Sequence, residues 1–84
     1  MLVDSVVLEE VTRAPMNGYT VRRSLARRGI EIAGSTVYAA LRRLERDGLL
    51  AAGWEEGRSR RVYRVTRAGL EALQVRRLEV RSSA

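Results

Sequence analysis

The chain contains no cysteine and no histidine. Their absence excludes disulfide bonds, thiol chemistry, metal sites built on thiolate or imidazole ligands, and a histidine general base. Only carboxylates, hydroxyls and guanidinium groups remain for catalysis, in a chain of 84 residues with little room for a pocket. A domain of this size buries only about 60–65 % of its unfolded surface. We therefore predict that the chain is not an enzyme and has no catalytic residues, no metal site and no cofactor.

Long apolar runs are also missing. No segment approaches the roughly 18–20 consecutive apolar residues that a membrane span needs. The N-terminus carries Asp4, Glu9 and Glu10, whereas a signal peptide begins with basic residues. We expect no membrane partner and a cytoplasmic location.

Lysine is the third missing residue type, because every basic residue in the chain is an arginine. The sixteen basic residues exceed the ten acidic ones, which gives a net charge of +6. Guanidinium groups fit phosphates and guanine edges better than ammonium groups do. This excess predicts a polyanionic partner, with a solvated basic surface as the alternative.

Apolar spacing predicts helices in the first half of the chain. Residues 2–13 have the spacing of an amphipathic helix, which Pro15 ends. Asn17 is predicted to cap a helix over about residues 18–28 that Gly29 ends. The inward side chains of this second helix are expected to be Tyr19, Val21 and Leu25. An Asn-Gly pair is also typical of a hairpin turn, but no alternating strand pattern flanks it.

The third helix has the clearest pattern. Ser35 is predicted to cap it and Gly48 to close it. Its apolar residues recur at i, i+3, i+4 and i+7, namely Val37, Ala40, Leu41 and Leu44.

A period of two then predicts short strands over residues 49–56 and 61–66, around a turn at residues 57–60. Thr66 is predicted to cap a last helix over about residues 67–82. The resulting fold class is α+β and mostly helical, a winged helix-turn-helix with three helices, a two-stranded wing and a C-terminal helix. We expect residues 1–66 to form the DNA-binding part and residues 67–84 the dimerisation helix.

Positive charge is concentrated on the predicted wing. No acid occurs between Glu56 and Glu71, and five arginines lie there: Arg58, Arg60, Arg61, Arg64 and Arg67. Such a wing favours contact with phosphates or a minor groove. The alternative is an edge strand that its charges protect from aggregation.

The outer face of the third helix is small at its start and basic along its length, which suits the major groove. An ordinary solvated face is the alternative. The predicted contacts on this helix are Ser35, Thr36, Tyr38, Ala39, Arg42, Arg43 and Arg46. Tyr38 is equally expected to pack against the wing. On the second helix, Arg22 and Arg23 are phosphate candidates.

The last helix has more apolar residues than one face needs. One stripe, Leu70, Leu73 and Val80, can cover the core of the domain, and a second, Val75 and Leu78, would be exposed. An exposed aliphatic stripe indicates self-association. The predicted dimer contacts are Val3, Val7, Leu73, Val75, Leu78 and Val80. Trp54 is expected to cover the hairpin against a neighbouring helix or subunit rather than to stack on a ligand.

Several motifs in combination resemble the PadR family of bacterial transcriptional regulators, over about residues 5–80. They are Asn17-Gly18-Tyr19-Thr20-Val21, the segment 34–50 with its Thr36-Val37-Tyr38 entry, Trp54, and the Tyr63-to-Gly69 exit. The resemblance implies a winged-helix repressor that dimerises through its C-terminal and first helices. It places the DNA contacts on the helix 35–46 and the wing 58–61.

Two features depart from the family pattern. Ala39 stands where the family usually has proline, which leaves the start of the helix more regular. The C-terminal helix is short for a family member, so no small-molecule effector is predicted, although some relatives bind one.

Together, these features predict a sequence-specific regulator that binds double-stranded DNA as a homodimer on a palindrome-like operator. The main alternative is a winged-helix protein-interaction module that does not read DNA. Non-specific chromosome or RNA binding is a weaker alternative, because the sequence lacks the aromatic platform that single-strand binders use.

Overall fold

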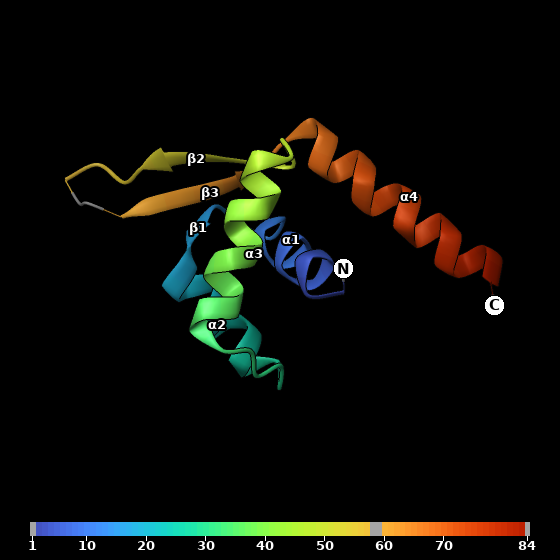
Figure 1. Cartoon of the computed structure of the whole chain (residues 1–84), viewed down its shortest axis with the longest axis horizontal. Coiled ribbons are helices and arrows are strands. Elements are labelled where there is room, and N and C mark those ends of the chain that lie inside the picture. The colour runs from blue at the N-terminus through green and yellow to red at the C-terminus, as the bar shows by residue number, and fades with distance from the viewer. Residues whose placement is uncertain (1, 58–59, 84) are drawn as a thin grey trace.

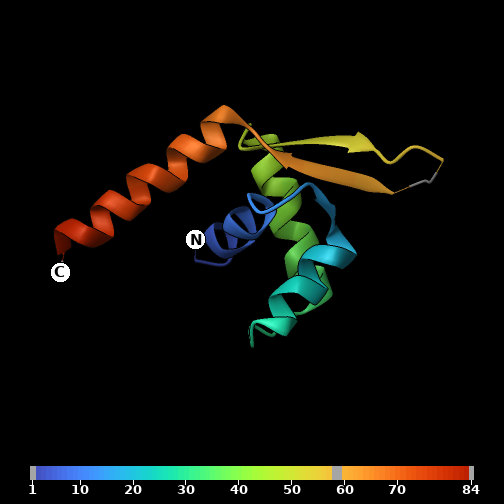
Figure 2. The ribbon, with the colours of Figure 1, turned by 180° about the vertical axis from the view of Figure 1, so that it is seen from behind.

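Three helices pack around a common core, and a hairpin and a fourth helix extend from it in opposite directions (Figure 1). The computed structural model describes residues 2–57 and 60–83. In chain order the elements are α1 (Leu2–Val11), β1 (Met16–Asn17), α2 (Gly18–Arg27), α3 (Gly34–Arg46), β2 (Leu50–Trp54), β3 (Arg61–Val65) and α4 (Arg67–Ser83). The view from behind shows the same separation of the hairpin from α4 (Figure 2). The predicted winged helix-turn-helix is therefore confirmed, with one strand more than the sequence indicated.

The core lies between α1, α2, α3 and the base of the hairpin. Its buried hydrophobic residues are Val7, Leu8, Val11, Val21, Leu25, Val37, Ala40, Leu41, Leu44, Leu50, Tyr63 and Leu73. All four apolar residues predicted to line the inner face of α3 are among them. Because this face of α3 is buried, the opposite face of the helix must point away from the core.

The start of α2 follows the predicted cap, but one of its side chains does not follow the predicted orientation. Asn17 Oδ1 accepts a hydrogen bond from the backbone N–H of Thr20 at 2.8 Å. Gly29 ends the helix with a φ of +83°, a conformation that glycine adopts without strain. The prediction that Tyr19 points into the core is wrong, because its side chain is 52 % exposed. The guanidinium of Arg23, one turn further along, lies 5.8 Å from the centre of its ring.

The predicted N-cap of α3 is also wrong. The helix begins at Gly34. Its N-cap is Ala33, two residues before the predicted cap Ser35, and Ala33 makes no side-chain cap bond. A hydrophobic contact replaces the polar cap, because Ile32 packs against the core cluster that contains Val37. These two residues occupy the positions of a hydrophobic staple around the start of a helix. The other end matches the prediction, since Gly48 closes the helix with a φ of +77°.

The wing belongs to a three-stranded antiparallel sheet with the order β1-β3-β2. Strand β2 pairs with β3 from Leu50↔Val65 to Trp54↔Arg61, and β1 adds the pair Met16↔Tyr63 on the other side. The two-residue strand β1 was not predicted, because a segment this short has no visible alternation. It joins the start of α2 to the middle of the wing.

Helix α4 begins where Thr66 connects it to the end of α3. Thr66 Oγ1 accepts a hydrogen bond from the N–H of Gly69 at 3.0 Å and donates one to the carbonyl of Gly48 at 2.7 Å. Beyond this point the helix makes few core contacts, and Leu73 is its only buried large hydrophobic residue among those described. The prediction that the stripe of Leu70 and Val80 covers the core is therefore wrong, since these side chains are 51 % and 63 % exposed.

One acidic side chain ties α1 to the end of α2. Glu10 is 3 % exposed, and its carboxylate accepts a hydrogen bond from the hydroxyl of Ser24. The same carboxylate lies 3.3 Å from Nε of Arg28 and 3.7 Å from Nε of Arg13. This arrangement gives Glu10 a structural role. Within the part of the chain that the structure describes, no helix has the length and apolarity needed to cross a membrane.

Candidate functional site

A hollow of about 460 Å³ lies between the start of α2, the middle of α3 and the wing. The three elements meet there because β1 joins α2 directly to β3. The hollow is lined by Asn17, Gly18, Tyr19, Tyr38, Arg42, Arg60, Arg61 and Tyr63. Three tyrosines and three arginines thus share one surface, and no acidic residue lines it.

Tyr38 lies against the backbone of α2. A methyl group placed on Gly18 would come within 2.2 Å of Cε1 of the Tyr38 ring, so only glycine allows this close approach. The ring is 42 % exposed and lines the hollow on its α3 side. The structure therefore places Tyr38 between α2 and the hollow.

The arginines predicted to contact DNA fall into two groups. Arg42 and Arg60 are exposed, and no acid of the described residues pairs with either. By contrast, Nη2 of Arg61 lies 2.6 Å from Oε2 of Glu45, and Nε of Arg46 lies 3.4 Å from Oδ1 of Asp47. Arg42 and Arg60 therefore present uncompensated charge beside the hollow, whereas Arg46 and Arg61 do not.

Arg43 is the most strongly held of these arginines. Its guanidinium makes two hydrogen bonds to Asp4 of α1, from Nη2 at 2.7 Å and from Nε at 3.1 Å. The hydrogen bonds from Arg43 lower the pKa of Asp4, and burial opposes this effect. The bond to Asp4 also raises the pKa of Arg43. Its guanidinium is thus directed toward α1.

The remaining predicted DNA contacts lie on α2, on the first half of α3 and on the wing. Ser35 and Thr36 are exposed at the start of α3, and Ala39 is half-buried one turn later. On α2, Arg22 extends toward the start of α3, where its Nη1 lies 3.5 Å from a Cβ built on Gly34. The predicted contacts also include Arg23, which lies on Tyr19 as described above, and Arg58, which falls outside the described residues.

Trp54 does not cover the hairpin against a helix of its own chain. Its side chain is 70 % exposed near the outer end of the wing. The first of the two predicted positions, against a neighbouring helix, is therefore wrong for this chain by itself. The second, against another subunit, stays a prediction.

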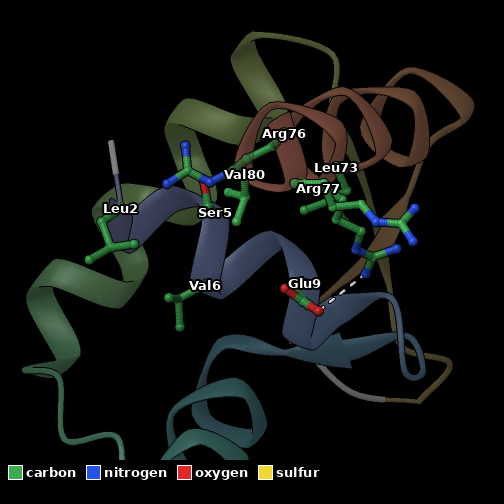
Figure 3. Close-up of a pocket in the computed structure, with 9 residues that line it drawn as sticks. Leu2, Ser5, Val6, Glu9, Leu73, Arg76, Arg77 and Val80 are labelled. Atoms are coloured by element: carbon green, nitrogen blue, oxygen red, sulfur yellow. Dashed lines mark hydrogen bonds and ion pairs between the residues drawn. The ribbon is translucent and has the colours of Figure 1, made fainter. Parts of the chain in front are cut away.

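A second hollow, of about 500 Å³, separates α1 from α4 (Figure 3). Most of the residues that line it are aliphatic residues and arginines of the two helices. The full set is Leu2, Ser5, Val6, Glu9, Leu73, Arg76, Arg77, Val80 and Arg81. An ion pair crosses it, because Nη2 of Arg77 lies 3.2 Å from Oε1 of Glu9 (Figure 3). Leu73 lies at its floor with only 4 % of its surface exposed.

This geometry corrects the predicted dimer contacts. Val7 has no exposed surface, so the prediction that it contacts a second copy is wrong. Val75 and Leu78 are more than half exposed, as the sequence predicted for the second stripe, and Val80 is more than half exposed as well. Leu2 on α1 is 67 % exposed as well and extends the same apolar surface.

Sequence reasoning missed several residues that line the first hollow. Tyr19 was assigned to the core, although Arg23 at i+4 is a spacing at which a helical arginine can lie on an aromatic ring. Asn17 and Gly18 were read only as helix-start residues. Asp4 was missed as the partner of Arg43, because no sequence signal joins two residues that are 39 positions apart.

Comparison with known proteins gives consistent matches. The model of the transcriptional regulator PadR-like family matches residues 7–75. The transcriptional regulator Rv3488 of Mycobacterium tuberculosis is 39 % identical over 69 residues, which cover 80 % of this chain. The chain spans 64 % of the length of that curated relative.

Two crystal structures show the same fold over almost the whole chain. A PadR family transcriptional regulator from Eggerthella lenta is 41 % identical, with a TM-score of 0.86, and the match covers 96 % of this chain and 72 % of that one. A PadR family transcription regulator from Clostridium difficile has a TM-score of 0.87 at 22 % identity, covering 96 % and 88 % of the two chains. Because the family model spans most of the chain, this protein belongs to the PadR-like family of transcriptional regulators.

Proposed function

We propose that this regulator binds a specific sequence in double-stranded DNA as a homodimer. Helix α3 enters the major groove, and the wing contacts the adjacent backbone. The dimer represses transcription by occupying an operator and excluding the polymerase from it. This proposal extends the family assignment to the partner, the assembly and the direction of regulation.

The observation that carries the proposal is the position of the unpaired arginines. Arg42 of α3 and Arg60 of the wing line one hollow that has no acidic residue. At the start of α3, Ser35 and Thr36 are exposed, and their short side chains allow a close approach to base edges. A helix of this kind fits the major groove, and phosphate contacts from its flanks position it there.

The homodimer is supported by apolar surface that the chain leaves uncovered. Val75 and Val80 of α4 and Leu2 of α1 are all more than half exposed. An aliphatic surface of this kind is unfavourable in water, and a second copy would bury it. The domain is also small, so burial against a copy adds stability that its own core lacks.

The charges around this surface also favour a second copy. Arg76 and Arg81 line the groove between α1 and α4 without an acid partner among the described residues, while Glu9 of α1 is half-exposed. A two-fold axis brings α4 of one subunit toward α1 of the other, so basic and acidic groups can meet. Two recognition helices related in this way lie about 34 Å apart on DNA, which predicts a palindrome-like site.

Selection of bound sequences from a pool of random duplexes tests the proposal. We expect enrichment of one motif with two-fold symmetry. A protein in which Arg42 and Arg60 are both replaced by alanine should enrich the motif far more weakly. Replacement of Arg27, which is exposed at the end of α2 and lines neither hollow, should leave enrichment intact. Failure of the unaltered protein to enrich any sequence, with self-association retained, would contradict the proposal and favour a protein-interaction module.

A further inference from the structure

The hollow between α2, α3 and the wing concentrates positive charge more than the sequence indicates. Of its three arginines, Arg61 is neutralised by Glu45 at 2.6 Å, whereas Arg42 and Arg60 have no acid partner among the described residues. The two come from different elements, and the fold directs both to the same surface. A concave surface that carries one sign of charge concentrates the opposite charge near it. The charge of this surface therefore favours an anionic ligand.

The walls of the hollow narrow the class of anion. Tyr19 and Tyr38 are about half exposed, so their hydroxyl groups are available as hydrogen-bond donors and their rings as apolar walls. Gly18 lets the Tyr38 ring lie directly against the backbone, which restricts its position. Guanidinium groups bind phosphate oxygens through paired hydrogen bonds. A phosphodiester with its sugar combines an anion with an apolar edge and matches this lining.

The size of the hollow agrees with such a ligand. Its volume of about 460 Å³ lies within the range of roughly 300–1,000 Å³ that holds small organic molecules in proteins. A single sugar–phosphate unit needs no more than this space. A base pair stacked inside a duplex cannot enter a surface hollow without leaving its stack, whereas a backbone phosphate can.

From these observations we infer that the hollow seats one backbone phosphate of the DNA duplex, held jointly by Arg42 and Arg60. The inference rests on the proposed function and refines it. Arg42 becomes an anchor that sets the position of α3 along the groove, rather than a side chain that reads guanine. Its loss should therefore weaken binding to every duplex by a similar factor and leave the selected motif unchanged.

The test combines protein variants with neutral phosphates in the DNA. Each phosphate of the selected duplex is replaced in turn by an uncharged methylphosphonate, and binding is measured for the unaltered protein and for Arg42→Met, Arg60→Met and Arg64→Met. Arg64 is the matched control, because it is exposed on the same strand as Arg61 but does not line the hollow. All three replaced residues are exposed on the surface, and circular dichroism verifies that each variant is folded.

We expect one phosphate in each half of the symmetric site whose neutralisation lowers the affinity of the unaltered protein at least about tenfold. A loss of this size is the cost of a lost charge-assisted hydrogen bond. Neutralising that phosphate should lower the affinity of Arg42→Met and of Arg60→Met much less, because each variant already lacks part of the contact. The affinity of Arg64→Met should fall as much as that of the unaltered protein. Such a result would show that the two arginines share one phosphate.

Two results would overturn the inference while leaving DNA binding intact. In the first, neutralisation has a reduced effect on affinity at one phosphate for Arg42→Met and at a different phosphate for Arg60→Met. In the second, neutralising each phosphate lowers the affinity of Arg42→Met as much as that of the unaltered protein. The variant then also selects a different motif, as loss of a base contact would cause. Absence of any duplex binding by the unaltered protein would overturn the proposed function, and this inference with it.

Discussion

The carboxylate of Asp4 on α1 holds the guanidinium of Arg43 on α3 through two hydrogen bonds, at 2.7 and 3.1 Å. The pair joins the first helix to the last turn of α3, across 39 positions of sequence. A planar guanidinium bound at two points resists rotation, so the pair fixes the orientation of α3 on α1.

The pH dependence of stability follows from this pair. Because its bonds to Arg43 hold the pKa of Asp4 below the ordinary value of 3.8, folding favours the charged carboxylate. The stabilisation is present above the ordinary pKa and is lost as the pH falls through the lower pKa of the folded chain. We expect Asp4→Asn to lower the urea midpoint at pH 7, and the difference from the unaltered protein to shrink below about pH 4.

Glu71→Gln is the control for this measurement. Glu71 also pairs with an arginine, Arg67 at 3.7 Å, but both side chains are largely exposed. Exposed ion pairs of this kind contribute little to the free energy of unfolding. A midpoint for Asp4→Asn that equals that of Glu71→Gln at every pH would contradict a structural role for Asp4.

Two neighbouring glutamates should differ in their effect on stability. Glu10 is buried and binds Ser24 and Arg28, whereas Glu9 is exposed and pairs only with Arg77. We expect Glu10→Ala to lower the free energy of unfolding by about 1–3 kcal/mol, because buried hydrogen-bonding groups lose their partner. Glu9→Ala should cost at most about 1 kcal/mol. Chemical denaturation of the two variants side by side measures the difference, and equal costs would argue against the role of Glu10.

Two glycines provide a matched pair for the junction between the wing and α4. A Cβ on Gly69 would lie 2.3 Å from the backbone oxygen of Leu49, which cannot move away as a side chain could. We expect Gly69→Ala to cost about 1–3 kcal/mol, because this overpacking outweighs the gain of alanine over glycine in a helix. Gly53→Ala, where the added methyl meets nothing within 4 Å, should be nearly neutral. Thermal unfolding compares them, and a neutral Gly69→Ala would show that α4 shifts freely at its start.

Self-association should depend on the exposed aliphatic residues of α4. Val75 is 54 % exposed, and a carboxylate at this position would be buried without a partner in a dimer interface. We expect Val75→Asp to sediment as a monomer at concentrations where the unaltered protein is a dimer. Gln74→Asp introduces the same charge at the adjacent, already polar position and should retain the dimer. A dimer that survives Val75→Asp would place the interface elsewhere.

Much of the fold was predictable, because it depends on local patterns. The spacing of Val37, Leu41 and Leu44 predicted the buried face of α3, and glycines with positive φ end α2 and α3 where expected. The hairpin and the Thr66 cap of α4 are equally local. The predictions failed where contacts between segments that are distant in the sequence determine the local structure. Strand β1 forms only because β3 lies beside it.

The site was predicted less completely, for the same reason. Helical spacing placed Arg42 and Arg43 next to each other on α3, but it could not show that a distant acid holds one and leaves the other unpaired. Tyr19 was assigned to the core because an aromatic ring is more often buried than exposed. Its actual place depends on the wing, which lies far away in sequence. Counting charges along the sequence therefore predicted that arginines gather on α3 and the wing, but it could not show which of them pair with acids.

The salt dependence of binding to a selected duplex tests the central claim most directly. If each subunit neutralises about four phosphates, the logarithm of the association constant should fall with the logarithm of salt concentration at a slope of about −7. Replacing Arg42 and Arg60 together should make this slope less steep by about 2 in the dimer, since one phosphate contact is lost per subunit. An unaltered protein whose binding does not change with salt would contradict the account.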